Sequence, residues 1–193
     1  MESNREINGF TMLSNTIDMK VGTTIWLTGM SGAGKTTIAK EIKSREAMGN
    51  IVIIDGDELR GGINSNLGFT DKDRNENVFR ASHICKIFNE NGIDVIACIM
   101  SPSEEQRKIA EEVIGKQKFF LTYVKCNIET LVKRDTKGLY EKYLRGEIKN
   151  MVGFDLPYEI PYNIDLCVDT RNESVEESAT KIIEKWLDFR FNL

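Results

Sequence analysis

A glycine-rich segment between an apolar run and an amphipathic helix constrains the fold more than any other feature of this chain. Residues 29–36 read G-M-S-G-A-G-K-T and match the pattern G-x-x-x-x-G-K-[ST]. The preceding residues 24–28 favour a β-strand, and Ile38 and Ile42, four residues apart, indicate a helix that follows at once. This strand, loop and helix context is the one in which the pattern binds phosphate groups.

The chemistry of such a phosphate-binding loop (P-loop) explains each residue type. Glycines let successive backbone N–H groups point at phosphate oxygens, and the helix that follows adds its positive end. Lys35 would span the β- and γ-phosphates, and the Thr36 hydroxyl would hold Mg²⁺. A purely structural glycine turn is the alternative, which the context disfavours. The predicted ATP-binding residues of the loop are Gly29, Met30, Ser31, Gly32, Ala33, Gly34, Lys35, Thr36 and Thr37.

The rest of the chain alternates strands with helices. Further strands are expected at residues 51–54, 94–100, 119–124 and 164–168, and helices at residues 36–44, 71–89, 102–114, 128–134 and 173–188. This alternation predicts an α/β fold, a three-layer α/β/α domain of the P-loop NTPase type with a five-stranded parallel sheet. One P-loop domain should span residues 21–193. Residues 1–20 are expected to form a mobile arm, and the long polar stretch at about 134–161 is expected to form a lid.

Composition narrows the class of partner. The chain has 26 Lys and Arg against 30 Asp and Glu, a net charge of −4, which argues against a nucleic-acid polymer as partner. Four separated cysteines without a C-x-x-C pair favour reduced thiols in a cytoplasmic protein. The single histidine disfavours a histidine-based zinc site, and the absence of a long apolar run predicts no membrane span.

Two carboxylates follow the second predicted strand, in Asp55-Gly56-Asp57. The carboxyl ends of strands are where α/β proteins bind ligands. Carboxylates beside a triphosphate either hold Mg²⁺ or take a proton from an acceptor hydroxyl. A simple Asp-Gly turn is the alternative. The N/T-K-x-D signature of GTPases is absent from the sequence.

Several motifs, in order and spacing, resemble those of adenylylsulfate (APS) kinases. They are the P-loop, D-G-D-E-L-R at 55–60, L-G-F at 67–69, D-R-N-E-N at 73–77 with Arg80, S-P at 101–102, R-D-T-K-G-L-Y at 134–140 and G-E-I-K-N at 146–150. The resemblance implies transfer of the ATP γ-phosphoryl group to the 3′-hydroxyl of adenosine 5′-phosphosulfate. It also implies a homodimer.

The resemblance assigns roles to individual residues. It implies Lys35 and Asp57 as catalytic residues, with Thr36 and Asp57 as Mg²⁺ partners and Arg134 at the ATP. The implied acceptor-binding residues are Asp55, Arg60, Phe69, Arg74, Asn77, Arg80, Lys137, Leu139 and Lys149. Arginine forks suit oxyanions, and an aromatic ring suits a base at ~1–3 kcal/mol of stacking. Without the resemblance, a solvated helix face would explain Arg74 and Arg80, plain core would explain Phe69, and a solvated charged loop would explain the lid lysines.

Ser101 has two interpretations. In some relatives a serine at this place is described as a phosphorylated intermediate, which makes Ser101 a candidate phosphoserine. Ser101-Pro102-Ser103-Glu104 also matches a capping box, with proline first in the helix and Glu104 third. We favour the helix cap.

Three departures from the family pattern concern the acceptor. Met151-Val152 stands where the family usually has Phe-Thr, Ser103-Glu104 where it has Tyr-Arg, and Gly61-Gly62 replaces a bulkier pair. Three hypotheses follow. The first is an APS kinase, the second a kinase for the 3′-hydroxyl of another activated nucleotide such as cytidine diphosphoramidate, and the third a P-loop regulator without transferase activity.

Overall fold

The computed structural model describes residues 21–45 and 49–192. The predicted arm, residues 1–20, lies outside the described residues. Five parallel strands form one sheet: β1 (Thr24–Thr28), β2 (Ile51–Asp55), β3 (Asp94–Cys98), β4 (Phe119–Lys125) and β5 (Leu166–Asp169). The order across the sheet is β2-β3-β1-β4-β5, so β1 lies at the centre, with Ile25 paired to Ile96 on one side and to Phe120 on the other.

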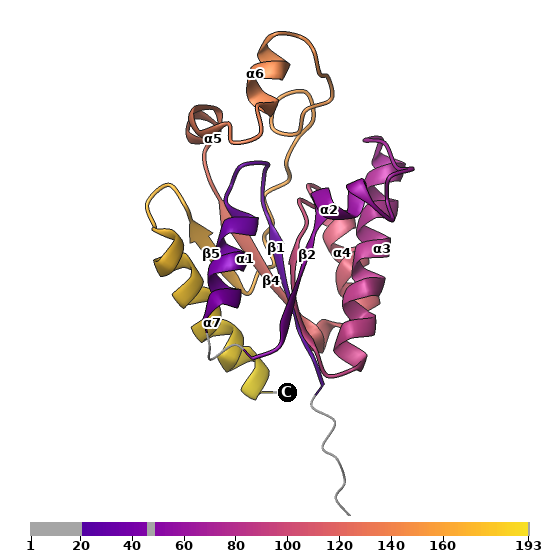
Figure 1. Ribbon diagram of the computed structural model, residues 1–193, viewed down its shortest axis with the longest axis vertical. Helices are drawn as coiled ribbons and strands as arrows, with labels where there is room; N and C mark the ends of the chain where they lie inside the picture. Colours follow the sequence, from indigo (N-terminus) through magenta and orange to yellow (C-terminus); the bar gives the residue numbers. More distant parts are fainter. Residues whose placement is uncertain (1–20, 46–48, 193) are drawn as a thin grey trace, which may run out of the picture.

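Helices cover both faces of this sheet (Figure 1). The helices α1 (Lys35–Ser44) and α7 (Val175–Phe191) pack together on one face, and α3 (Asp71–Glu90) and α4 (Glu104–Ile114) pack together on the other. The three-layer α/β/α fold with a five-stranded parallel sheet is therefore confirmed. Within the described residues, no helix is long and apolar enough to cross a membrane.

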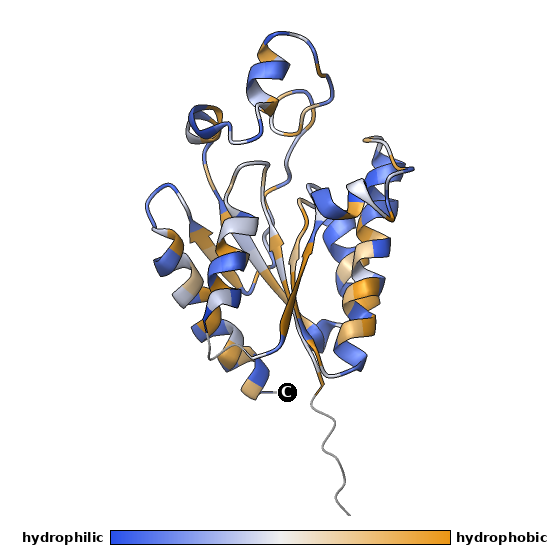
Figure 2. Cartoon of the chain, in the orientation of Figure 1, coloured by the Kyte–Doolittle hydropathy of each residue, from blue (hydrophilic) through white to orange (hydrophobic). Residues whose placement is uncertain are grey.

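The alternation of side chains along β1 divides the core in two. Ile25 and Leu27 pack in the cluster that includes residues of α1 and α7, whereas Trp26 packs in the cluster that includes residues of α3 and α4. All three side chains are fully buried. Burial of each contributes about 1.5–3 kcal/mol. Figure 2 shows the hydrophobic residues concentrated on the strands and on the inward sides of the helices.

Three of the remaining helices lie beyond the carboxyl ends of the strands (Figure 1). Three short helices, α2 (Gly56–Gly61), α5 (Ile128–Arg134) and α6 (Leu139–Leu144), belong to this end. A short 3-10 helix, η2 (Lys116–Lys118), precedes β4. The sequence pattern predicted α5 but not α2 or α6. All four cysteines are free thiols; Cys85, Cys98 and Cys126 are buried, and Cys167 is exposed.

Candidate active site

A cavity of about 890 Å³ opens at the carboxyl edge of the sheet. It is lined by the P-loop, the ends of β2 and β3, the first half of α3 and the segment 134–161 that was predicted to form a lid. Most predicted site residues meet there: Ser31, Gly32, Gly34, Lys35, Thr36, Thr37, Asp55, Asp57, Arg60, Phe69, Arg74, Asn77, Ser101, Arg134, Lys137, Leu139 and Lys149. Of the predicted residues in the described part of the chain, Gly29, Met30, Ala33 and Arg80 do not line it.

The P-loop owes its shape to its glycines. Gly29 has φ 150°, and a Cβ there would lie 2.4 Å from the carbonyl oxygen of Val124 on β4. Gly34, the N-cap of α1, has φ 103°, a value that side-chain-bearing residues rarely adopt. The glycines therefore let the loop lie against β4 and turn directly into α1.

Lys35 folds back over this loop. Its Nζ donates hydrogen bonds to the carbonyl oxygens of Gly29, at 2.7 Å, and Met30, at 2.9 Å. Burial lowers the pKa of Lys35 to about 8, because loss of hydration disfavours the charged amine. A bound phosphate would favour the protonated form and oppose this shift.

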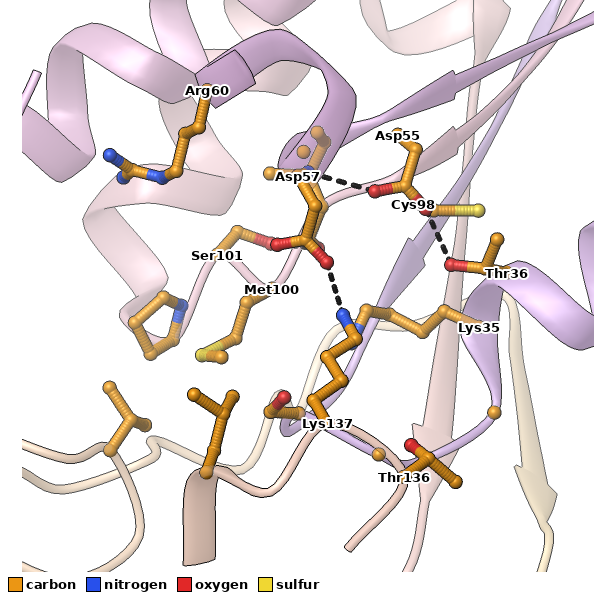
Figure 3. A pocket seen from close by; sticks show the side chains of 18 of the residues that line it. Lys35, Thr36, Asp55, Asp57, Arg60, Cys98, Met100, Ser101, Thr136 and Lys137 are labelled. Atoms are coloured by element: carbon orange, nitrogen blue, oxygen red, sulfur yellow. Dashed lines mark hydrogen bonds and ion pairs between the residues drawn. The ribbon is translucent and has the colours of Figure 1, made fainter. Parts of the chain in front are cut away.

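Asp55 connects the P-loop helix to the end of β2. Its carboxylate accepts a hydrogen bond from Thr36 Oγ1 at 2.5 Å and another from the backbone N–H of Asp57 at 2.8 Å, which caps α2. The side chain is 9% exposed. Figure 3 shows these contacts on one wall of the cavity.

These oxygen atoms fit Mg²⁺. Within residues 21–45 and 49–192, no group of three or more His, Cys, Asp or Glu side chains converges as a metal centre. Mg²⁺ is usually held by one or two carboxylates together with substrate phosphates and water, so a full protein cage is not required. The Thr36 hydroxyl and the carboxylates that follow β2 supply the expected ligand type.

Asp57 is paired with the lid. Its carboxylate forms an ion pair with Lys137 Nζ (Figure 3). Both side chains remain solvated, with 68% of Asp57 and 47% of Lys137 exposed. Such an exposed pair is worth about 0–1 kcal/mol, so a substrate can separate it at little cost.

Phe69 is an aromatic platform flanked by two guanidinium groups. The Cζ atom of Arg60 lies 4.6 Å from the ring centroid and that of Arg74 lies 5.6 Å from it. Thr70 and Asp73 form a capping box that starts α3 and so places Phe69 and Arg74 together. Burial is the main cause that lowers the pKa of both arginines, and each still carries its charge at neutral pH. Because Phe69 is 62% exposed, the core interpretation of this residue is wrong.

The backbone holds these arginines in position. Arg60 Nη1 donates to the carbonyl oxygen of Gly68 at 2.8 Å, and Arg74 Nε donates to that of Phe69 at 3.0 Å. The nearby Asn77 is buried and accepts a hydrogen bond from Asn64 Nδ2 at 3.0 Å. These contacts favour a prearranged wall with two positive charges.

Arg80 lies away from that wall. It donates to Glu76 Oε1 at 2.7 Å, to the carbonyl oxygen of Ile63 at 3.1 Å and to Asn66 Oδ1 at 3.0 Å. These contacts fasten the segment after α2 to α3. The geometry thus favours a structural role for Arg80, and its predicted substrate contact stays a prediction.

Ser101 does not cap a helix, and that prediction is wrong. The N-cap of α4 is Ser103, whose side chain accepts from the backbone N–H of Gln106 at 3.3 Å. Ser101 Oγ instead accepts a hydrogen bond from Trp26 Nε1 at 3.0 Å. Ser101 is 1% exposed and has φ 38°, a conformation that its fixed neighbours maintain. Ser101 lines the cavity, but its hydroxyl is buried against Trp26, which is a poor position for a phosphorylated side chain.

The predicted lid segment packs on the P-loop. Tyr140 is buried and its hydroxyl donates to the carbonyl oxygen of Ser31 at 2.8 Å, while the hydroxyls of Tyr158 and Thr28 are 2.8 Å apart. A Cβ on Gly153 would lie 2.8 Å from Met30 Sδ. The segment is therefore more than a solvated charged loop.

Arg134 connects the start of the lid to the loop after β5. It donates to the Thr170 hydroxyl at 3.1 Å and to the Thr170 carbonyl oxygen at 2.6 Å. Thr170, Glu173, Ser174 and Val175 line the cavity and were not predicted. Their position after a strand of a parallel sheet was the available signal. Gln106, in the first half of α4, also lines the cavity and was missed.

Comparisons with known proteins agree with this geometry. The family model described as adenylylsulphate kinase matches residues 21–169. An adenylyl-sulfate kinase of Clostridium kluyveri is 43% identical over 165 residues, which cover 84% of this chain and 82% of that protein. One of Bacteroides thetaiotaomicron is 43% identical over 164 residues, which cover 83% of this chain and 81% of that protein.

A solved structure shows the same likeness. The APS kinase of Mycobacterium tuberculosis in complex with AMPPNP and APS has a TM-score of 0.82 and 36% identity, and the match covers 86% of this chain and 98% of that one. The fold, the ordered motifs and these relatives agree. The chain belongs to the adenylylsulphate kinase family.

Proposed function

We propose that this protein transfers the γ-phosphoryl group of ATP to the 3′-hydroxyl of adenosine 5′-phosphosulfate. The observation that carries the proposal is that one cavity joins a P-loop to a carboxylate and two arginines beside an exposed aromatic ring. Lys35, Thr36, Asp57, Arg60, Phe69 and Arg74 all line this cavity. Lys35 and Thr36 would bind the donor, and Arg60, Phe69 and Arg74 would bind the acceptor. A regulator that only binds a nucleotide would need the P-loop part of this cavity, and would not need the carboxylate, the two arginines and the ring.

The transfer requires few groups from the protein. Asp57 would orient the acceptor 3′-hydroxyl and take its proton as the oxygen attacks the γ-phosphorus. A bond forms between that oxygen and phosphorus, and the bond from phosphorus to the β,γ-bridging oxygen breaks, so that ADP leaves. Lys35 would turn from its backbone partners to the β- and γ-phosphate oxygens, where its charge stabilises the transition state.

Magnesium would be held by the Thr36 hydroxyl with Asp55 and Asp57, and when bound it would neutralise charge on the phosphates. The lid has a separate task. Arg134, Leu139 and Lys149 line the cavity from the lid, so a docked lid would exclude water, the competing acceptor. Lys137 would then leave the carboxylate of Asp57 and turn to the nucleotides.

Release of ADP, measured with APS as acceptor, tests the proposal. Asp57→Ala should lose about 10²–10⁴-fold in turnover while it still binds ATP. Glu58→Ala is the matched control, because Glu58 is an exposed carboxylate of the same short helix outside the cavity lining. Near-normal turnover of Asp57→Ala would contradict the assigned role, and absence of APS-dependent ADP release in the unmodified protein would contradict the activity.

A second candidate function rests on Met151 and Val152. Both line the cavity and are nearly buried, at 9% and 7% exposure. Neither offers the flat ring that would complete an aromatic sandwich around a base, and a methionine side chain adapts to different shapes. Another activated nucleotide, such as cytidine diphosphoramidate, is therefore the competing acceptor. Stronger stimulation of ADP release by that compound than by APS would favour it.

The family resemblance also implies a homodimer, and the free thiols favour a cytoplasmic protein. Light scattering of the purified chain would test the first, with a mass twice the 22.0 kDa of one chain as the expected result.

A further inference from the structure

A buried carboxamide oxygen in the acceptor half of the cavity has no hydrogen-bond partner. In the described part of the chain, two buried side-chain polar atoms lack a partner, Gln106 Oε1 and Thr122 Oγ1. Gln106 is 3% exposed and lines the cavity, whereas Thr122, on β4, does not. An unpaired buried acceptor costs about 1–3 kcal/mol, so this atom calls for a donor.

A short chain of hydrogen bonds fixes which way the Gln106 carboxamide faces. Asn75 Nδ2 donates to Glu105 Oε1 at 3.3 Å, and a carboxylate can only accept. The amide oxygen of Asn75 therefore faces Gln106 and accepts from its Nε2 at 3.0 Å. The nitrogen of the Gln106 amide is thereby used, and its oxygen is the free end.

The position of Gln106 limits the ligand that could supply the donor. Its hydrogen-bond partner Asn75 follows Arg74 in α3, and both Arg74 and Asn77 line the same cavity. Gln106 therefore belongs to the acceptor half. A phosphosulfate group offers only acceptor oxygens, which a carboxamide oxygen would repel. Apart from the reacting 3′-hydroxyl, the donors on an acceptor nucleotide are the exocyclic amine of its base and its ribose 2′-hydroxyl.

We propose that Gln106 is a specificity-determining residue that accepts a hydrogen bond from the nucleoside part of the acceptor. The inference rests on the proposed transfer to a nucleotide 3′-hydroxyl and adds a contact that discriminates among nucleosides. Gln106 thus complements Arg60 and Arg74, which bind the anionic part. It takes no part in proton or phosphoryl transfer.

The test compares three acceptors: APS, its counterpart with a 6-oxo base, and its 2′-deoxy counterpart. For each, kcat/KM is measured in the unmodified protein and in Gln106→Met, which keeps the side-chain length and removes both polar groups. The unmodified protein should prefer APS to the analogue that lacks the donor bound by Gln106. This preference, the ratio of kcat/KM for APS to kcat/KM for that analogue, should fall about tenfold in Gln106→Met. The 6-oxo arm reports a contact to the base, and the 2′-deoxy arm a contact to the ribose.

The ratio separates this role from a structural one, because damage to the fold lowers kcat/KM for all three acceptors alike. Ratios unchanged by Gln106→Met would overturn the proposal. Should this variant not fold, the unmodified protein still decides: equal kcat/KM for APS and both analogues overturns the proposal, and Gln106→Glu, which keeps an acceptor oxygen, should preserve discrimination. Failure of the proposed function is distinct, since APS then gives no ADP release in the unmodified protein.

Discussion

Replacement of Ser101 by alanine tests whether this residue is structural or chemical. Its hydroxyl accepts from Trp26 Nε1 at 3.0 Å and lies 3.1 Å from Thr28 Oγ1. In Ser101→Ala the indole N–H stays buried without a partner. The Thr28 hydroxyl loses one hydrogen-bond partner but keeps two others, because it still donates to the Met100 carbonyl oxygen at 2.6 Å and contacts the Tyr158 hydroxyl.

The expected loss follows from that one orphaned donor. A buried N–H without a partner costs about 1–3 kcal/mol. The φ of 38° at position 101 adds nothing to the difference, since alanine tolerates it no better than serine. Because a domain of this kind has a free energy of unfolding of about 5–15 kcal/mol, the variant should fold. Phosphoryl transfer should continue at a normal rate.

Urea unfolding followed by circular dichroism measures the loss, and a double-mutant cycle assigns it. Trp26→Phe removes the donor, so Ser101→Ala should cost at least about 1 kcal/mol less in that background. Ser103→Ala is the control: it removes the α4 cap at about 1 kcal/mol, and its effect should be additive with Trp26→Phe. Additive effects of Ser101→Ala and Trp26→Phe would refute the reasoning. Loss of turnover at unchanged stability would instead support a phosphorylated serine.

Three further predictions follow from the site. The pKa of Lys35 is lowered to about 8, so the free protein loses this positive charge as the pH rises through 8. The Kd of AMPPNP, measured by calorimetry, should be constant below pH 8 and rise up to about tenfold per pH unit above it. A Kd that does not change with pH would contradict the lowered pKa. Lys137→Met should change the free energy of unfolding by less than about 1 kcal/mol, because its ion pair with Asp57 is exposed, yet lower turnover about a hundredfold; equal turnover would remove Lys137 from the transfer step. Arg80→Ala should lower the free energy of unfolding by about 1–2 kcal/mol and leave the KM for the acceptor nearly unchanged, whereas a large rise in KM would restore its predicted contact with substrate.

Features encoded by neighbouring residues could be predicted from the sequence. The P-loop depends on contiguous glycines between a strand and a helix, and β1 has the predicted bounds Thr24–Thr28. The helices α2 and α6 were not predicted, because six residues are too few to show a helical period.

Contacts between distant segments could not be predicted. Residues 101–104 and 103–106 both match a helix-cap pattern. Ser103 caps α4, whereas Ser101 accepts a hydrogen bond from Trp26, which is far away in the sequence. The unpaired oxygen of Gln106 depends on the packing of α4 against α3, which no local pattern reveals. The exposure of Phe69 likewise depends on how the segment before α3 lies.

The central position of β1 has a consequence for how this chain folds. β1 pairs with β3, whose residues come about 70 positions later, and with β4, whose residues come about 95 positions later. Both strand pairings of β1 therefore close long loops, which slows folding of parallel sheets. A chain emerging from the ribosome keeps one edge of β1 open until Phe119–Lys125 has been made. The unpaired backbone N–H and C=O groups of that edge can pair wrongly with another chain during synthesis.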